Sequence, residues 1–254
     1  MPISANDMNN RAFQVIPFQQ NTLPVAVVGN HRRFVLLNNR VDTTDALLAG
    51  GLYGVSFTKN AAGTGFYLPY FQNQISSVEL DAHPAIGGVQ FFTTDNLSGC
   101  AIYIDRDTVT NNLIVYHANN VANSPPALLA GAVPTPLVVQ VNNQPTMDGY
   151  HGAAQGDYPN ALVNLAALYK PAYLAGVQAE INRKTGQDRA VTGYLAGTTV
   201  CGFYTGGVWR FHYQTWGFLD YTRPDKAPMR WINGKARVGG NDDIELFAPP
   251  ARFY

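Results

Sequence analysis

Short apolar and β-rich runs follow one another along the chain, separated by polar turn residues, which is typical of β-strands. Such runs cover Pro24–Val28, Arg33–Asn38, Leu52–Thr58 and Gly88–Thr94, and Ile75–Asp81 alternates with period two, the pattern of a half-buried strand. They are rich in the β-branched and aromatic residues that favour strands. Glycine- and asparagine-containing stretches between them suit turns. The pattern therefore predicts many short strands.

The clearest helical pattern lies between Pro159 and Thr185, where apolar residues recur every three or four positions. Pro171 divides this stretch. Because proline is tolerated in the first turn of a helix but not in its interior, the pattern predicts two helices in a hairpin. A shorter helix is predicted after Thr43-Thr44-Asp45, which would cap it. From Ala190 onward the chain returns to β character.

These elements predict an α+β fold with mostly antiparallel sheets, arranged like a sandwich and flanked by a central helical hairpin. We expect a single domain over residues 1–254, because this length suits one large core and no repeat or low-complexity tract divides it. Residues 88–120 would hold a hairpin that carries the candidate chemistry, and residues 190–254 would form a carboxyl-terminal β-rich part.

The charge balance narrows the classes of function. Lys plus Arg and Asp plus Glu each number 17, and charged residues make up only 13% of the chain. A neutral chain lacks the basic face that neutralises phosphates, so no nucleic-acid partner is expected. No stretch is long and apolar enough for a membrane span, and the first residues do not form a signal peptide. We therefore expect a soluble protein made in the cytosol, whose export would not use a signal peptide.

The two cysteines, Cys100 and Cys201, are too few for a disulfide framework. No metal site is expected, because the five histidines are scattered and no Cys-x-x-Cys pair is present. Cys201 has no acid–base partner at hairpin spacing, which favours a buried structural role. Cys100 is different, because it precedes two predicted strands, Ala101–Asp105 and Leu113–His117, and the second of these ends in a histidine.

In an antiparallel hairpin, the position numbers of facing residues have a constant sum. For Cys100 and His117 this sum places the loop centre between Thr108 and Val109, within the polar stretch Arg106–Asn112. The symmetric register predicts that both side chains lie face to face on one side of the sheet, with Cβ atoms about 5 Å apart. At that distance an imidazole can stabilise a thiolate and later protonate a leaving group.

The residues around the predicted pair suggest supporting roles. Gly99 leaves room for a substrate and permits a backbone geometry that exposes the Cys100 N–H as an oxyanion donor. We expect the pair in an open position that solvent can reach. A third group usually orients the histidine of such a pair. The candidates for this role are Thr94, Asp95 and Asn96 upstream, and Asn119 and Asn120 downstream.

The stretch Asp95–Cys100 (DNLSGC), with a strand, a turn and a strand ending in His117, resembles the catalytic domain of the cytotoxic necrotizing factors. It is more similar still to the Burkholderia lethal factor type, whose signature is Leu-Ser-Gly-Cys, here Leu97 to Cys100. The resemblance covers residues 88–120. It departs from the necrotizing factors at Ala101, where they carry threonine, and the hairpin is longer than in the lethal factor.

The resemblance implies a glutamine deamidase, in which Cys100 and His117 react and the backbone oxygen of Thr94 orients His117. The thiolate would form a thioester with a glutamine side chain of a host protein, which water then hydrolyses to glutamate. Backbone amides, helped by Ser98, would hold the oxyanion, and no cofactor is required. The family's targets imply a Rho-type GTPase or a translation factor as partner, reached by a bacterial toxin or effector delivered to the host cytosol.

Two alternatives stay open. The low charge, the many Asn and Gln residues and the aromatic carboxyl-terminal third also suit a β-rich binding or assembly protein without enzymatic activity. The same Cys–His pair would also serve a transglutaminase or another cysteine hydrolase, because an amine can replace water in attacking a thioester.

Overall fold

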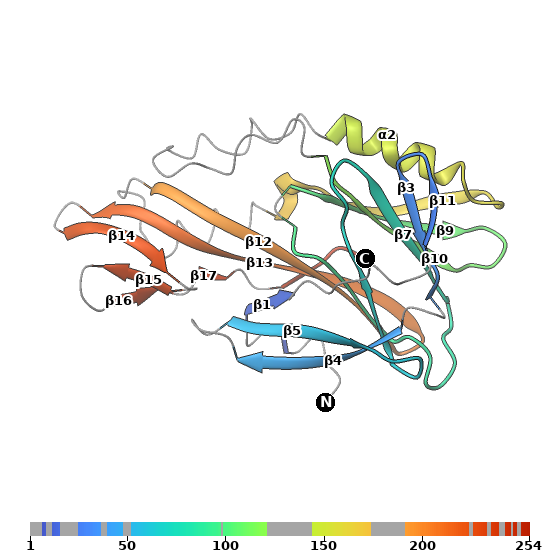
Figure 1. Ribbon diagram of the computed structural model, residues 1–254, viewed down its shortest axis with the longest axis horizontal. Coiled ribbons are helices and arrows are strands. Elements are labelled where there is room, and N and C mark those ends of the chain that lie inside the picture. Colours follow the sequence, from blue (N-terminus) through green and yellow to red (C-terminus); the bar gives the residue numbers. More distant parts are fainter. Residues whose placement is uncertain are drawn as a thin grey trace.

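The computed structural model describes residues 7–8, 12–15, 25–36, 40–47, 52–97, 99–120, 144–173, 191–223, 226–232, 235–238, 242–244, 246–247 and 250–254. Strands dominate this part of the chain and form two mixed sheets (Figure 1). The sheets pack face to face, and a helix lies on the outer side of the smaller one. The fold is therefore mostly β with few helices.

The larger sheet, here called sheet A, has twelve strands in the order β1-β5-β4-β6-β8-β12-β13-β14-β15-β16, and β17 and β18 pair with β13. Its long antiparallel pair β12–β13 joins the part near β8 to the strands β14 to β16 (Figure 1). The strand bounds are β1 (Ala12–Val15), β4 (Arg40–Leu47), β5 (Leu52–Lys59), β6 (Gly65–Leu68), β8 (Phe91–Thr94), β12 (Val191–Thr205), β13 (Val208–Arg223), β14 (Lys226–Ile232), β15 (Lys235–Val238), β16 (Asp242–Ile244), β17 (Leu246–Phe247) and β18 (Ala251–Arg252).

The smaller sheet, here called sheet B, has six strands in the order β11-β9-β10-β7-β3-β2. Helix α2 (Gln144–Gln155) packs on β7, β9 and β10 from outside (Figure 1). The strand bounds are β2 (Val25–Val28), β3 (His31–Phe34), β7 (Ile75–Leu80), β9 (Ala101–Asp107), β10 (Leu113–Ala118) and β11 (Leu162–Leu168).

The main hydrophobic core lies between the two sheets. Phe92 and Phe211 enter it from sheet A, and Ile102 and Val115 enter it from sheet B. Because successive side chains of a strand point to opposite faces, the neighbours of these residues in sheet B point the other way, toward α2. Each strand of the central part of sheet B therefore has an inner face against sheet A and an outer face against the helix.

The outer face of sheet B forms a second core with α2. Tyr103 and Tyr116 of the sheet pack there against Met147 and Ala154 of the helix. Met147, His151 and Ala154 are the buried residues of α2, and their spacing of four and three positions puts them on one helical face.

The prediction of mostly antiparallel sheets is wrong in part, because both sheets are mixed. β3 pairs with β7 in parallel, and so do β1 with β5 and β6 with β8. The predicted hairpin β9–β10 is antiparallel as expected, and β2 and β3 also pair antiparallel. The parallel pairs join strands that are distant in the sequence, which alternation along a single strand cannot reveal.

The predicted helical hairpin at Pro159–Thr185 is also not observed. Its first half forms strand β11, which pairs with β9 and carries an irregularity between Asn164 and Ala166. The free edge of β9 offers a full ladder of hydrogen bonds, and this tertiary pairing outweighs the helical preference of the alanines and leucines. Residues 170–173 are helical, and the rest of the predicted second helix lies outside the described residues.

The short helix predicted after Thr43-Thr44-Asp45 does not begin there, because these residues, with Ala46 and Leu47, belong to β4, which pairs with β5. The rest of that predicted helix lies outside the described residues. Conversely, α2 lies in a glycine-containing stretch for which the sequence analysis predicted no helix. Both errors arose at glycine-containing segments whose local preferences are weak, so the neighbouring strands decided the structure.

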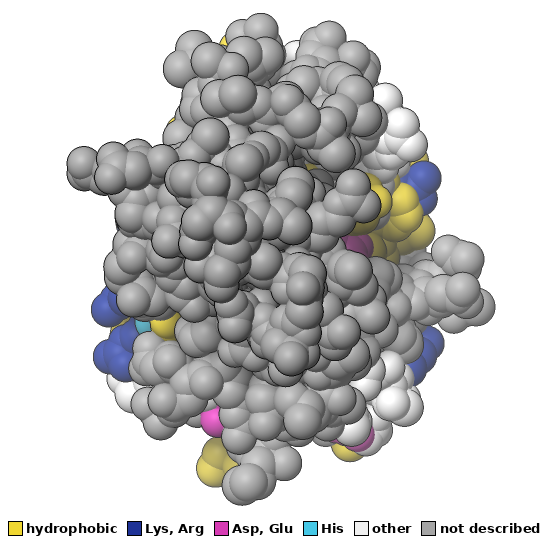
Figure 2. Space-filling view, turned by 90° about the vertical axis from the view of Figure 1, so that its left-hand side faces the viewer, with side chains coloured by type: hydrophobic (Ala, Val, Ile, Leu, Met, Phe, Trp, Pro, Cys, Tyr) yellow, Lys and Arg dark blue, Asp and Glu magenta, His cyan; other side chains and the backbone are white. Residues whose placement is uncertain are grey.

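The described surface carries charges of both signs. Figure 2 shows Lys and Arg as well as Asp and Glu side chains among the described residues at the rim of the face that it presents. This distribution agrees with the equal numbers of acidic and basic residues in the chain. Among the described helices, none has the length and apolar character that crossing a bilayer requires.

Candidate functional site

The turn between β9 and β10 sets the register of the candidate hairpin. The side chain of Asp107 accepts hydrogen bonds from the backbone N–H groups of Val109 (2.7 Å) and Thr110 (3.0 Å). Asn111 takes a left-handed conformation with φ of 62°, which asparagine tolerates. The Asp107 N–H then donates to the carbonyl of Asn112 and closes the loop. A short polar side chain that bonds to the backbone two residues later is a typical turn former.

This turn shifts the register by two residues from the predicted one. His117 faces Ile102 on β9 instead of Cys100, and Ala118 faces Ala101. Continuing the same register places Asn119 opposite Cys100. The prediction of a directly facing Cys–His pair is therefore wrong, because Asp107 centres the loop one residue later than the symmetric estimate.

A shift of two keeps the pair on one face of the sheet. Cys100, Ile102 and Val115 belong to the core between the sheets, and His117 follows Val115 by two positions. Because the side-chain period of a strand is two, His117 points to the same inner face as Cys100. The two residues are diagonal neighbours, and such pairs have Cα atoms about 7–8 Å apart.

Asn119 takes the position next to the sulfur that was predicted for the histidine. Its Nδ2 donates a hydrogen bond to Cys100 Sγ at 3.1 Å. The orientation of the amide is fixed from the other side, because its Oδ1 accepts the N–H of Asn73 at 3.4 Å. The Asn119 N–H in turn donates to the carbonyl of Gln74. The sequence analysis named Asn119 only as a candidate for orienting His117.

Two residues of the segment that follows β11 approach Cys100 from another direction. The Tyr173 hydroxyl donates to the Cys100 carbonyl at 3.2 Å and fixes the backbone at the cysteine. Burial lowers the pKa of Lys170 to about 8, and its electrostatic interaction with Cys100 opposes this shift. A cation near a cysteine favours the thiolate. Sequence reasoning missed both residues, because they stand far along the chain within the predicted helical hairpin.

The ring of His117 is fully buried, and the His117 carbonyl accepts a hydrogen bond from the Ser76 hydroxyl at 3.4 Å. Among the described residues, neither ring nitrogen of His117 bonds to another group, Cys100 included. Burial lowers the pKa of His117 to about 3, although the backbone of Leu68 acts to raise it. The imidazole is therefore neutral at physiological pH in this conformation. A neutral imidazole has one N–H donor and one lone pair. Among the described residues neither makes a hydrogen bond of regular geometry, and the Leu68 backbone is the polar group that acts on the ring.

The pair is closed to solvent, contrary to the expectation of an open site. Cys100 is 3% exposed and His117 is 0% exposed. The ring of Tyr70 lies 5.9 Å from that of His117, measured between centroids, and Tyr70 itself is 45% exposed. Tyr70 is therefore a solvent-exposed ring beside the buried His117. Its segment is anchored by Asp95, whose carboxylate accepts the Tyr70 N–H at 3.0 Å and the Tyr67 hydroxyl.

The remaining predicted site residues lie on the strand and loop that precede Cys100. Thr94 ends β8, is buried, and pairs in parallel with Leu68. Leu97 is buried and exchanges backbone hydrogen bonds with Thr198. Gly99 is partly exposed, and Ser98 lies outside the described residues. The proposed contact of the Thr94 backbone oxygen with His117 is not formed, since the ring nitrogens have no described partner.

Cys201 provides an internal contrast. It is buried in the core on the far side of sheet A, as the sequence analysis expected. Burial raises the pKa of Cys201 to about 12, and its hydrogen bond with Thr93 acts in the opposite direction. Within the described ranges, no three His, Cys, Asp or Glu side chains are grouped to hold a metal ion.

Comparison with known proteins finds no related sequence but does find a weakly similar structure. No protein-family model matches the sequence, and no curated protein does. Among solved structures, the fold is weakly similar to the C-terminal domain of CNFy from Yersinia pseudotuberculosis, with 8% identity and a TM-score of 0.26. The match covers 74% of this chain and spans 65% of that chain.

Proposed function

We propose that this protein is a cysteine amidohydrolase that converts a glutamine side chain of a host protein to glutamate. The observation that carries the proposal is the hydrogen bond from Asn119 Nδ2 to Cys100 Sγ, beside a buried His117 whose ring nitrogens have no described partner. The sequence resemblance around DNLSGC supplies the substrate class. The structure described here has a closed site, so the proposal includes an opening step.

An unpartnered buried histidine needs an explanation. Leaving a buried donor or acceptor without a hydrogen bond destabilises the folded protein by about 1–3 kcal/mol per group. Such exceptions are rare in folded proteins, and a catalytic role is one of their known causes. At His117 an apolar residue would fill the same space between the sheets without this penalty. An imidazole on the same face as a hydrogen-bonded cysteine supports a role in proton transfer.

Opening must precede the reaction. A general base is most effective when its pKa lies near the working pH, and a pKa of about 3 is too low. Displacement of Tyr70 would admit water and substrate, and the loss of desolvation would raise the pKa of His117. A substrate carboxamide would then bring a carbonyl oxygen, which accepts hydrogen bonds, and N–H groups, which donate them, to His117 and Asn119.

The first half-reaction forms a thioester. The thiol of Cys100 gives its proton to His117, and the sulfur attacks the carboxamide carbon as the carbonyl double bond opens. The oxyanion accepts a hydrogen bond from the second N–H of the Asn119 side chain, a group of the kind that serves in oxyanion holes. His117 then returns the proton to the nitrogen, the carbon–nitrogen bond breaks, and ammonia leaves.

The second half-reaction releases glutamate. Water gives a proton to His117 and adds to the thioester carbon, and the tetrahedral species collapses with the return of the proton to the sulfur. The protonated Lys170 amine near Cys100 favours the sulfur anion in both halves. The target, a Rho-type GTPase or a translation factor, and delivery to the host cytosol rest on the family resemblance alone.

The decisive experiment is incubation with eukaryotic cell lysate, followed by a search by mass spectrometry for Gln-to-Glu conversion. We expect Cys100→Ala to abolish the conversion by at least about a thousandfold, as loss of a nucleophile does. Cys201→Ala is the matched control, since Cys201 is equally buried on another face, and it should retain activity. Amine incorporation or peptide cleavage in place of deamidation would favour a transglutaminase or another cysteine hydrolase.

Alkylation provides a test that needs no substrate. Iodoacetamide should modify Cys100 faster than Cys201, because opening exposes a thiol near a cation, whereas Cys201 has a raised pKa. Equal, slow modification of both thiols in the native protein would contradict the proposal, since a sealed cysteine cannot act as a nucleophile.

A binding or assembly protein is the second candidate, and the exposed strand β2 favours it. All four residues of β2 are exposed, and none of the described strands pairs with its outer edge. Val27 and Val28 are each more than half exposed. An apolar sheet edge is a ready template for strand addition from another chain. If Cys100 is inert while Val27→Lys reduces self-association in sedimentation experiments, this candidate replaces the enzyme.

A further inference from the structure

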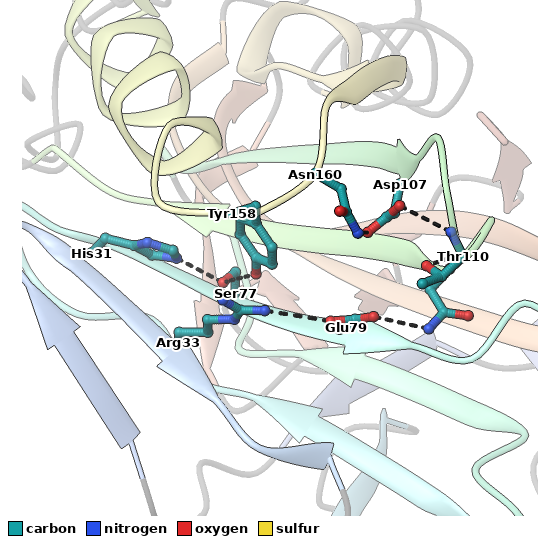
Figure 3. A network of polar contacts seen from close by, with 9 residues as sticks. His31, Arg33, Ser77, Glu79, Asp107, Thr110, Tyr158 and Asn160 are labelled. Carbon is teal, nitrogen blue, oxygen red and sulfur yellow. Dashed lines mark hydrogen bonds and ion pairs between the residues drawn. The ribbon is translucent and has the colours of Figure 1, made fainter.

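A chain of polar contacts joins sheet B to the turn that follows α2. Nδ1 of His31 lies 2.7 Å from Asp157 Oδ2, and its Nε2 lies 2.7 Å from Ser77 Oγ. Ser77 Oγ lies 2.8 Å from the Tyr158 hydroxyl. Figure 3 shows His31, Ser77 and Tyr158 in line between the strands and the segment that leaves the helix. His31 and Ser77 come from β3 and β7, whereas Asp157 and Tyr158 follow α2.

Ser77, His31 and Asp157 follow one another in the order of a catalytic triad, but the Ser77 hydroxyl is not accessible as a nucleophile. Ser77 is 0% exposed, and the Tyr158 hydroxyl occupies the free side of its oxygen. The same contacts tie one end of the helical segment to the sheet. Their common function is therefore attachment, and their sensitivity to protons follows from the directions of the hydrogen bonds.

Only one proton arrangement satisfies every group when His31 is neutral. The Nδ1–H donates to the Asp157 carboxylate, so Nε2 is an acceptor and takes the Ser77 hydroxyl proton. Ser77 Oγ in turn accepts the hydroxyl proton of Tyr158. Protonated His31 donates from both nitrogens, and Nε2–H then points at Ser77 Oγ. Either Ser77 or Tyr158 is left with a hydroxyl hydrogen that has no acceptor in the described contacts.

Taken together, the surroundings of His31 favour its neutral form over its protonated form. Asp157 favours it, whereas the guanidinium of Arg33 on the same strand opposes it. Arg33 is held over the Tyr158 ring at 3.9 Å and lies 3.4 Å from Glu79 of β7. From β10, the aromatic ring of Tyr116 faces His31 at 6.2 Å. Burial is the largest influence and, against Asp157, lowers the pKa of His31 below 6.5.

The body of α2 is attached by a second histidine whose bond tolerates protonation. His151 Nε2 lies 2.8 Å from Asp105 Oδ2, and Gln155 and Asn164 also donate to this carboxylate. Burial acts to raise the pKa of Asp105, but these hydrogen bonds outweigh it and lower the pKa. Since His151 only donates in this contact, a proton added to its other nitrogen leaves the bond intact.

We propose that the Tyr158–Ser77–His31–Asp157 relay is an acid-sensitive latch. When His31 gains a proton, the turn Gly156–Tyr158 detaches from sheet B, while the body of α2 stays attached through His151 and Asp105. The latch releases one end of the helical layer and uncovers the outer core around Tyr116. This inference is independent of the proposed enzymatic function, because it uses the opposite face of sheet B from Cys100.

Amide hydrogen exchange tests the latch on the intact protein. The N–H groups of Gly156, Asp157 and Tyr158 bond to carbonyls in the last turn of α2, so their protection reports this turn. After correction for intrinsic rates, we expect them to lose roughly tenfold protection between about pH 7.5 and about pH 5. Protection of β9 and β10 should stay constant. A loss that includes these strands would show global unfolding and overturn the proposal.

Three variants identify the titrating group. His31→Gln cannot gain a proton and should show no acid-dependent step, and Tyr158→Phe should show a smaller one because no Tyr158 hydroxyl is present to lose its acceptor. His151→Gln is the matched control, and the acid step at Asp157 and Tyr158 should persist in it. If His31→Gln does not fold, NMR titration of the wild-type His31 ring must give a midpoint that coincides with the exchange step. A different midpoint, or a step that persists in His31→Gln, would refute the latch.

Discussion

The two faces of sheet B treat buried histidines in opposite ways. On the outer face, His31 of β3 and His151, which reaches this face from α2, each contact a carboxylate and lie among tyrosines. On the inner face, His117 lies in the apolar core between the sheets and its nitrogens have no described partner. The outer histidines contribute to the attachment of a layer. The inner histidine weakens the fold, so its presence is better explained by chemistry than by stability.

The contrast follows from the residues available to each face. The outer face includes Asp105 and Ser77 from its own strands and Asp157 from the helical segment, so imidazoles find partners there. The inner face meets the aromatic and aliphatic side chains of sheet A. At the end of the hairpin, Asn119 bonds to Cys100, and Ser76 of β7 stands opposite His117 and bonds to its carbonyl. The candidate site is therefore confined to that end.

The largest expected effect is the pH dependence contributed by His117. Its pKa is about 3 in the folded protein and 6.5 when exposed, so the unfolded chain binds the proton first as the pH falls. The contribution of this pKa difference to the free energy of unfolding is fully present above pH 6.5. Below that pH it decreases by about 1.4 kcal/mol per pH unit, so that about 5 kcal/mol has been lost near pH 3. Urea unfolding of the wild type and of His117→Leu at several pH values measures this term as their difference. Parallel curves for the two proteins would contradict it.

Apolar replacement should have opposite signs on the two faces. His117→Leu removes two unsatisfied nitrogens from an apolar core and should raise the free energy of unfolding at neutral pH by about 1–3 kcal/mol. His151→Leu leaves the buried carboxylate of Asp105 without that donor and should lower it by about 1–3 kcal/mol. Chemical denaturation at neutral pH measures both. An equal decrease in the free energy of unfolding for both substitutions would contradict the difference between the two faces.

Removal of Tyr70 should connect the inner site to solvent. Tyr70→Ala is expected to raise the pKa of His117 from about 3 toward its ordinary value and to accelerate alkylation of Cys100 by roughly tenfold. NMR titration and iodoacetamide kinetics measure the two effects. Ile86→Ala is a suitable control, because Ile86 is fully exposed and should change neither quantity. An unchanged His117 pKa would mean that Tyr70 does not shield it.

The smallest expected effect concerns the helix that covers the outer face. A Cβ added at Gly152 of α2 would meet no atom within 4 Å, so Gly152→Ala fits without strain. Alanine is the better helix former and should raise the free energy of unfolding by about 0.5–1 kcal/mol. Thermal or urea unfolding checks this value. A decrease would show that the outer layer has a structural requirement for glycine at this position.

Several elements could be predicted because their signals are local. β5, β7 and the strands of the β9–β10 hairpin follow from alternation and β-branched residues. The true register of that hairpin also had a local signal, since Asp107 and Asn111 are turn-forming residues at a suitable spacing. Likewise, the spacing of Met147, His151 and Ala154 indicated α2. These two signals were present in the sequence and were not used.

Other features had no local signal. Leu162–Leu168 has a helical pattern, yet it forms an edge strand because β9 offers hydrogen bonds along its free edge. The approach of Lys170 and Tyr173 to Cys100, and the position of Tyr70 over His117, join segments that lie far apart in the chain. Burial of the candidate site was equally unpredictable, because it depends on how sheet A covers the inner face.

By itself, the sequence determined that the chain is strand-rich, that Cys100 and His117 flank one hairpin, and that they point to the same face. These follow from periods and turns within short segments, where the covalent chain limits the choices. Only the tertiary structure decided which residue contacts the sulfur, which histidines find partners, and which of them solvent can reach. Such properties depend on the packing of distant segments, and side-chain spacing along one strand contains no information about what lies opposite it.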